Sequence, residues 1–136
     1  PEVEELALEA YGRNLGIAFQ LIDDAIDYVS DAGTMGKDAG DDFREGKMTL
    51  PVILAYARAN DEERAFWKDA VEGRRTSDED FAHAITLVRK SRAVDDTMAR
   101  ARHYGGLAIE AIRGFADGPA KSAMIEAVEF AVARAY

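Results

Sequence analysis

Three aspartates near residue 25 have the types and spacing needed to bind a divalent cation. Asp23 and Asp27 are four residues apart, so on a helix their carboxylates lie one turn apart on the same face, with Asp24 beside them. Two like charges at this spacing repel each other, and a cation between them turns the repulsion into attraction. Magnesium prefers hard oxygen ligands, commonly one or two carboxylates with water and substrate phosphates. Because solvated helix faces also carry such clusters, the following segment decides between the two interpretations.

That segment carries two Gly-Lys pairs ten residues apart, Gly36-Lys37 and Gly46-Lys47. Glycine lets the backbone approach a ligand, and lysine offers a mobile positive charge for phosphate oxygens. Asp41 and Asp42, between the pairs, could contact a metal or its bound water. The segment is not a P-loop, because Met48 stands where a P-loop needs Ser or Thr and no strand pattern precedes it. Taken alone, it also fits an exposed loop with ordinary surface lysines.

The elements that position these residues are expected to be helices. Only three prolines occur, long stretches are rich in Ala, Leu, Glu and Arg, and no alternating strand pattern is present. We therefore expect an all-α helical bundle of about six helices. A first helix is expected over residues 3–29, followed by a polar segment over 30–48 and a second helix from an N-cap at Thr49 to before Asn60. Three further helices are expected to be capped by Asn60 (with Glu63), Ser77 and Ser91. Gly105-Gly106 interrupts the last of these three by a kink or a close helix contact, and a final helix begins at Pro119.

Composition excludes several classes of function. The length of 136 residues suits one domain, and the formal net charge of -9 disfavours nucleic-acid binding. The absence of cysteine excludes disulfides, thiolate zinc sites and cysteine nucleophiles. The absence of cysteine also fits a reducing cytoplasm, where we expect the protein. No apolar run is long enough for a transmembrane helix.

Taken together, the motifs resemble those of the trans-isoprenyl diphosphate synthase (polyprenyl synthetase) family. The resemblance covers residues 11–57 and rests on the segments 15–27, 36–37, 40–42 and 46–51, the last reading Gly-Lys-Met-Thr-Leu-Pro. Residues 23–27 look like the second aspartate-rich motif of that family. The resemblance implies the isoprenoid synthase fold, of which residues 1–136 would be the C-terminal part, with the N-terminal half absent.

The resemblance also implies roles for individual residues. Mg2+ would be the cofactor, and the substrates would be an allylic diphosphate and isopentenyl diphosphate. The implied metal ligands are Asp23, Asp24 and Asp27; the implied catalytic residues are Asp23, Lys37 and Lys47; and the implied substrate-binding residues are Phe19, Gln20, Lys37, Asp42 and Lys47.

The implied reaction is the head-to-tail condensation of the two substrates to a longer linear polyprenyl diphosphate in isoprenoid biosynthesis. The first aspartate-rich motif of the family is missing, so we expect the isolated chain to be an inactive part of the enzyme. Its uncovered apolar faces predict a homodimer or a higher oligomer. Two alternatives stay open: a non-catalytic or regulatory subunit of a heteromeric prenyl synthase, and a related terpene cyclase. Product length cannot be read from these residues.

Overall fold

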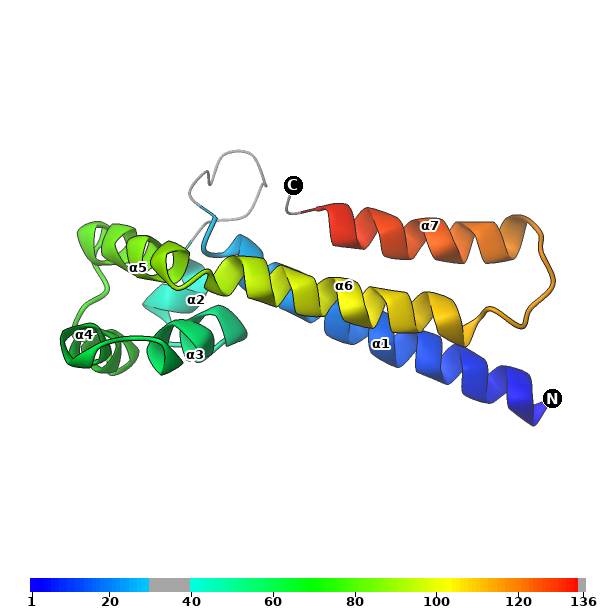
Figure 1. Ribbon diagram of the computed structural model, residues 1–136, viewed down its shortest axis with the longest axis horizontal. Coiled ribbons are helices and arrows are strands. Elements are labelled where there is room, and N and C mark those ends of the chain that lie inside the picture. Colours follow the sequence, from blue (N-terminus) through cyan, green and yellow to red (C-terminus); the bar gives the residue numbers. More distant parts are fainter. Residues whose placement is uncertain (30–39, 135–136) are drawn as a thin grey trace. The chain divides into compact units, whose positions relative to one another are not determined.

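The computed structural model describes residues 1–29 and 40–134, and every regular element in them is an α-helix (Figure 1). This confirms the all-α expectation. The expected number of helices is exceeded by a four-residue helix, α2, inside the segment interpreted as a loop. The helices are α1 (Glu2–Ile26), α2 (Asp41–Arg44), α3 (Leu50–Ala57), α4 (Asp61–Val71), α5 (Asp78–Lys90), α6 (Ala93–Ala111) and α7 (Pro119–Ala133).

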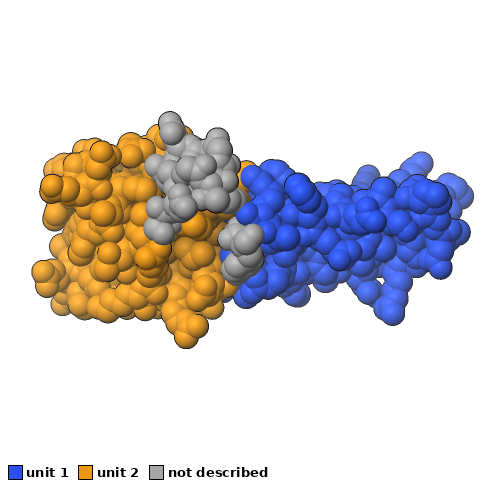
Figure 2. All heavy atoms as spheres, turned by 90° about the horizontal axis from the view of Figure 1, so that it is seen from above, with its two compact units in different colours: residues 1–22, 98–136 blue, residues 23–97 orange. Residues whose placement is uncertain are grey.

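Whereas the length suggests one domain, the chain groups into two compact units (Figure 2). Unit 1 combines residues 1–22 with residues 98–136, and unit 2 consists of residues 23–97. The sequence-predicted site residues are divided between them, since Phe19 and Gln20 belong to unit 1 and the aspartates of the motif to unit 2.

Small side chains and a long-range hydrogen bond help to hold the helices of unit 1 together. The hydroxyl of Tyr11 on α1 donates to the carbonyl of Met124 on α7 at 2.8 Å. Helix α6 continues through Gly105-Gly106, and a Cβ at Gly105 would meet Val132 Cγ2 of α7 at 3.0 Å and Val128 Cγ1 at 3.2 Å. Of the two explanations for this glycine pair, the close helix contact is therefore confirmed.

Unit 2 is built around an aromatic core that fixes the short helix α2. A four-residue helix is too short to be stable alone, but Phe43 in α2 is buried. Its ring centroid lies 5.6 Å from that of Phe81, 6.4 Å from that of Phe66 and 6.4 Å from that of Trp67. Burial of Phe43 thus anchors α2 by tertiary packing and sets the position of its neighbour Asp42.

Local capping signals decide where several helices of unit 2 begin. Both arms of the predicted Asn60–Glu63 capping box are present at α4, and Ser77 caps α5 through Asp80. Thr49 is the N-cap of α3 as predicted, although its side chain makes no capping hydrogen bond.

Two predicted boundaries are wrong. Helix α1 ends at Ile26 rather than Val29, because the chain closes in a tighter turn there. Ser91 does not cap the start of α6; it is the C-cap of α5, and its hydroxyl donates to the carbonyl of Val88 at 2.9 Å. Arg92, with φ 59°, interrupts the helical backbone between α5 and α6.

Candidate functional site

The three motif aspartates lie at the C-terminal end of α1 and in the turn that follows. The amide of Asp27 donates to the carbonyl of Asp23 at 3.3 Å, so one helical turn still separates them although α1 ends at Ile26. Asp27 is fully buried, Asp24 is 8% exposed and Asp23 is half-buried. Asp23 is therefore the most accessible of the three carboxylates.

Helix α2 brings a fourth carboxylate into unit 2. Gly40 precedes it with φ 93°, and a Cβ at this position would meet the ring of Phe81 at 3.1 Å, so only glycine suits both the dihedral angle and the space. The following helix carries Asp41 on its exposed side and Asp42 on its buried side. Asp42 is thus positioned by the glycine before it and by the burial of Phe43 after it.

The hydroxyl of Tyr28 is subject to the negative charge of three of these carboxylates. Its ring is buried against Phe81, with centroids 6.0 Å apart. Burial raises the pKa of Tyr28 most, and the charges of Asp27, Asp42 and Asp24 raise this pKa further. Since all three act on one hydroxyl, the fold concentrates negative charge from α1 and α2 around it. That hydroxyl has no hydrogen-bond partner within the described residues.

Lys47 supplies positive charge at the edge of this cluster. Its Nζ lies 3.6 Å from Asp42 Oδ1 and 3.1 Å from Glu45 Oε2, and its side chain is 57% exposed. The hydrogen bond that Lys47 donates to Glu45 raises the pKa of Lys47 most, followed by the charges of Glu45 and Asp42. Lys47 is therefore a charged, solvent-accessible ammonium beside a buried carboxylate.

Gly46 has a different role from the one its sequence context suggests. Its φ of 72° requires glycine, but a Cβ there would lie 2.6 Å from the carbonyl oxygen of Val71. The close approach that this glycine permits is therefore to the protein's own backbone. The amide of Lys47 then donates to the carbonyl of Asp42 at 3.0 Å, which ties the lysine to the end of α2.

The remaining predicted site residues belong to unit 1 or lie outside the described residues. Phe19 and Gln20 are exposed on α1 in unit 1, where the guanidinium of Arg134 lies 4.6 Å from the ring centroid of Phe19. Lys37 lies outside the described residues. Sequence reasoning missed Tyr28 and Glu45, although both have a local signal: an aromatic residue directly after the last aspartate and an acid two residues before the lysine.

The donor set of the cluster suits a hard divalent cation. It consists of carboxylate oxygens, and buried like charges gain from a cation that neutralises them. Within residues 1–29 and 40–134, no three acidic or histidine side chains converge closely enough to hold a metal alone. Magnesium binding by one or two carboxylates plus phosphate oxygens is compatible with this geometry.

Comparison with known proteins identifies the family. A family model described as polyprenyl synthetase matches residues 2–88. The chain belongs to the polyprenyl synthetase family. Octaprenyl diphosphate synthase of Haemophilus influenzae is 36% identical to this polyprenyl synthetase chain over 137 aligned positions, which cover 99% of the chain and 41% of that enzyme. A probable mitochondrial hexaprenyl pyrophosphate synthase of Neurospora crassa is 41% identical over 122 positions, covering 85% of the chain and 25% of that protein.

Solved structures agree with this assignment. The polyprenyl synthase of Caulobacter crescentus, crystallised with calcium and isoprenyl diphosphate, matches 100% of this polyprenyl synthetase chain and 42% of its own, with a TM-score of 0.92 and 43% identity. A decaprenyl diphosphate synthase of Rhodobacter capsulatus matches with a TM-score of 0.90 and 39% identity, over 100% of this chain and 42% of its own. The chain thus spans about two-fifths of the length of these relatives. Among the described helices, none is both long and apolar enough to cross a bilayer.

Proposed function

We propose that this chain forms the part of a polyprenyl diphosphate synthase that binds the metal ion and the diphosphate of the allylic substrate. The spacing of Asp23 and Asp27 by one helical turn and the 3.6 Å approach of Lys47 Nζ to Asp42 Oδ1 carry the proposal. It places accessible positive charge next to carboxylates in an acidic protein. A diphosphate needs such help, because a carboxylate cluster alone would repel it.

The proposed reaction lengthens a prenyl chain without a protein nucleophile. The allylic C–O bond breaks and its electron pair leaves with the diphosphate, which generates an allylic cation. The double bond of isopentenyl diphosphate attacks this cation, a C–C bond forms, and one proton is lost to restore a double bond. The barrier therefore depends mainly on stabilising the departing diphosphate.

Each residue has a defined part in this scheme. The ammonium of Lys47 binds an oxygen of the departing diphosphate, and Lys37 is proposed to bind another. Asp23, Asp24 and Asp27 are proposed to hold Mg2+, with Asp42 orienting Lys47. When bound, Mg2+ neutralises negative charge on the diphosphate. Phe19 and Gln20 are proposed to line the path of the prenyl chain.

The relatives support a finer proposal about the product. Octaprenyl, hexaprenyl and decaprenyl synthases among them favour a long-chain product over a short one. We also propose that the protein functions as a homodimer in the cytoplasm. Exposed Val3, Leu6 and Phe130 in unit 1 support self-association, since they form apolar surface that water solvates poorly.

A chimaera tests the proposal in a complete enzyme. Residues 1–136 would replace the matching two-fifths of the Caulobacter crescentus polyprenyl synthase, and turnover of an allylic diphosphate with isopentenyl diphosphate would be measured in Mg2+. We expect an active chimaera. Lys47→Ala should lower kcat by about 100-fold, the usual effect of removing one group that stabilises developing negative charge. Asp23→Ala should raise the Mg2+ concentration required.

Two matched variants control for unspecific effects. Glu62→Ala removes an exposed carboxylate and Lys90→Ala an exposed ammonium of unit 2, both outside the aspartate cluster. Both should leave kcat within about threefold of the unmodified chimaera, the range of small surface effects. Full turnover after Asp23→Ala and Lys47→Ala are combined would refute the proposal. A well-folded but inactive chimaera would favour the non-catalytic subunit.

A further inference from the structure

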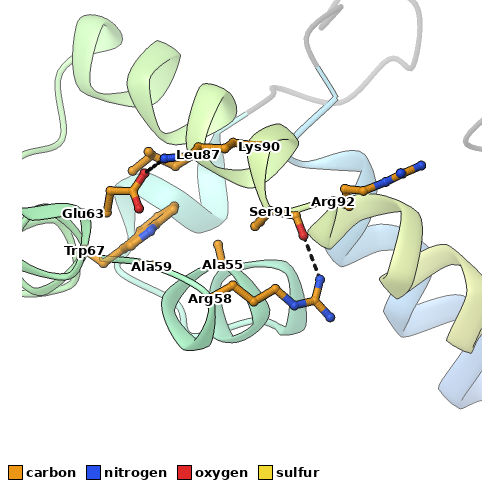
Figure 3. A pocket seen from close by; sticks show the side chains of 9 residues that line it. All are labelled: Ala55, Arg58, Ala59, Glu63, Trp67, Leu87, Lys90, Ser91 and Arg92. Atoms are coloured by element: carbon orange, nitrogen blue, oxygen red, sulfur yellow. Dashed lines mark hydrogen bonds and ion pairs between the residues drawn. The ribbon is translucent and has the colours of Figure 1, made fainter. Parts of the chain in front are cut away.

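Unit 2 contains a pocket that lies apart from the aspartate cluster, and none of the residues that line the pocket belongs to that cluster. It has a volume of about 290 Å³ and lies where the ends of α3 and α5 meet α4 (Figure 3). Ala55, Trp67 and Leu87 give it a buried apolar side. Its volume is at the lower end for small-molecule sites, so a ligand of few heavy atoms would fill it.

Two cations approach this pocket from different helices. Arg58 Nη1, at the end of α3, lies 2.8 Å from the carbonyl oxygen of Ser91 and 2.7 Å from Asp96 Oδ2. Lys90 Nζ, at the end of α5, lies 2.9 Å from Glu63 Oε2. Figure 3 shows the side chain of Arg92 extending away from these groups, so Arg58 and Lys90 are the cations available to a ligand.

The cations of the pocket keep hydrogen-bond donors that are not in use, whereas the acceptor oxygens of Glu63 and Ser91 already accept hydrogen bonds. The contacts of Arg58 with described residues use only Nη1, which leaves the Nε and Nη2 hydrogens, and Lys90 keeps two of its three ammonium hydrogens. Glu63 Oε1 already accepts from the Asn60 amide and Oε2 from Lys90. The carbonyl of Ser91 accepts from Arg58. A complementary ligand is therefore rich in acceptors.

Charge and shape narrow the ligand class. The Arg58–Asp96 pair is exposed at 41% and 47%, so it contributes little and can yield to a competing anion. A phosphate monoester carries about two negative charges at pH 7 and so matches two cations, whereas a carboxylate carries one. The apolar side of the pocket at Trp67 and Leu87 suits a short hydrocarbon group attached to the phosphate.

We propose that this pocket binds a small phosphate monoester, with its phosphate held by Arg58 and Lys90 and its short hydrocarbon group on Trp67 and Leu87. The site is separate from the proposed catalytic function. A ligand here would stabilise the mutual packing of α3, α4 and α5, because it contacts all three.

Trp67 is the only tryptophan of the chain, so its fluorescence reports on this pocket directly. The intact 136-residue chain would be titrated with 3-methylbutyl phosphate in metal-free buffer. Inorganic phosphate, 3-methylbutanol and 3-methylbutanoate would be titrated in parallel. We expect a saturable change with the ester at millimolar concentration or below, and weaker binding of the three partial ligands.

Variants of Arg58 and Lys90 distinguish a role of these cations in ligand binding from a role in stabilising the fold. Arg58→Ala and Lys90→Ala should each weaken ester binding by roughly tenfold, the usual loss for a charge-assisted hydrogen bond. Arg13→Ala, an exposed arginine of unit 1, and Lys47→Ala should leave ester binding unchanged. Circular dichroism identifies any variant that fails to fold. In that case Arg58→Lys serves as the second test, because it keeps the charge but loses the planar donors, and we expect an intermediate loss of affinity for the ester.

Three outcomes would overturn the proposal. They are no saturable signal with the ester, equal affinity for inorganic phosphate (an adventitious ion only), and unchanged ester affinity in folded Arg58 and Lys90 variants. Equal binding of 3-methylbutanoate would reject the phosphate class. None of these results depends on the aspartate cluster, so the proposed catalytic function is judged separately.

Discussion

Substituting Gly46 by alanine is the most direct test of how the fold positions Lys47. Two costs coincide at this residue. Its φ of 72° disfavours any residue with a Cβ by about 1–2 kcal/mol. The new Cβ would also lie 2.6 Å from the carbonyl oxygen of Val71, an overlap with backbone that only a shift of α4 or of the turn can relieve. Such overpacking costs about 1–3 kcal/mol.

The expected net destabilisation is about 1–4.6 kcal/mol, after roughly 0.4–1 kcal/mol is subtracted for the reduced freedom of the unfolded chain. Urea denaturation would be followed by the fluorescence of Trp67, which lies in the same unit as Gly46. In the chimaera, the displaced Lys47 should also lower kcat, because its amide would lose the 3.0 Å hydrogen bond to the Asp42 carbonyl.

Gly73 provides a matched control for this prediction. It has a similar φ of 84°, and a Cβ there would meet nothing within 4 Å. Gly73→Ala should therefore cost only the backbone contribution, about 1 kcal/mol. If the Gly46 and Gly73 variants were equally destabilised, the contact with Val71 would be irrelevant and the reasoning would fail.

Three further predictions concern other parts of the fold. Gly105→Ala should destabilise unit 1 by up to about 2 kcal/mol through its overlap with Val132, whereas Gly106→Ala, which meets nothing, should be neutral or stabilising; thermal melts by circular dichroism would distinguish them. Tyr28→Phe should leave the metal-free chain as stable as before or up to about 1 kcal/mol more stable in urea denaturation, because it removes a buried hydroxyl without a described partner; a clear loss would show that the hydroxyl is satisfied. The hydrogen bond from the Asn60 amide lowers the pKa of Glu63 most, followed by that from Lys90, so the stabilising contribution of this carboxylate is complete above its unfolded pKa and is lost as pH falls through the lower folded value. Glu63→Gln should therefore make the free energy of unfolding in urea less dependent on acidic pH, and an unchanged dependence would contradict this.

Local sequence patterns were sufficient to predict much of the secondary structure. The Asn60–Glu63 and Ser77–Asp80 capping boxes form within four residues, so their patterns predict where α4 and α5 begin. Asp117-Gly118-Pro119 likewise predicts the start of α7. Ser91 shows the limit of such reasoning, since a serine between two helices can cap either one, and here its hydroxyl bonds back to Val88 of α5 while Arg92 takes the positive φ.

Residue types and short spacings are enough to predict the helical class, the family motifs and the order of aspartates and lysines along the chain. Tertiary packing was needed to show that Asp42 is buried with Lys47 beside it, and that Gly46 faces Val71 rather than a ligand. Both results depend on contacts between residues far apart in the chain. Burial of Phe43 among Phe66, Trp67 and Phe81 provides the free energy that holds α2 in place, and no local pattern encodes that packing.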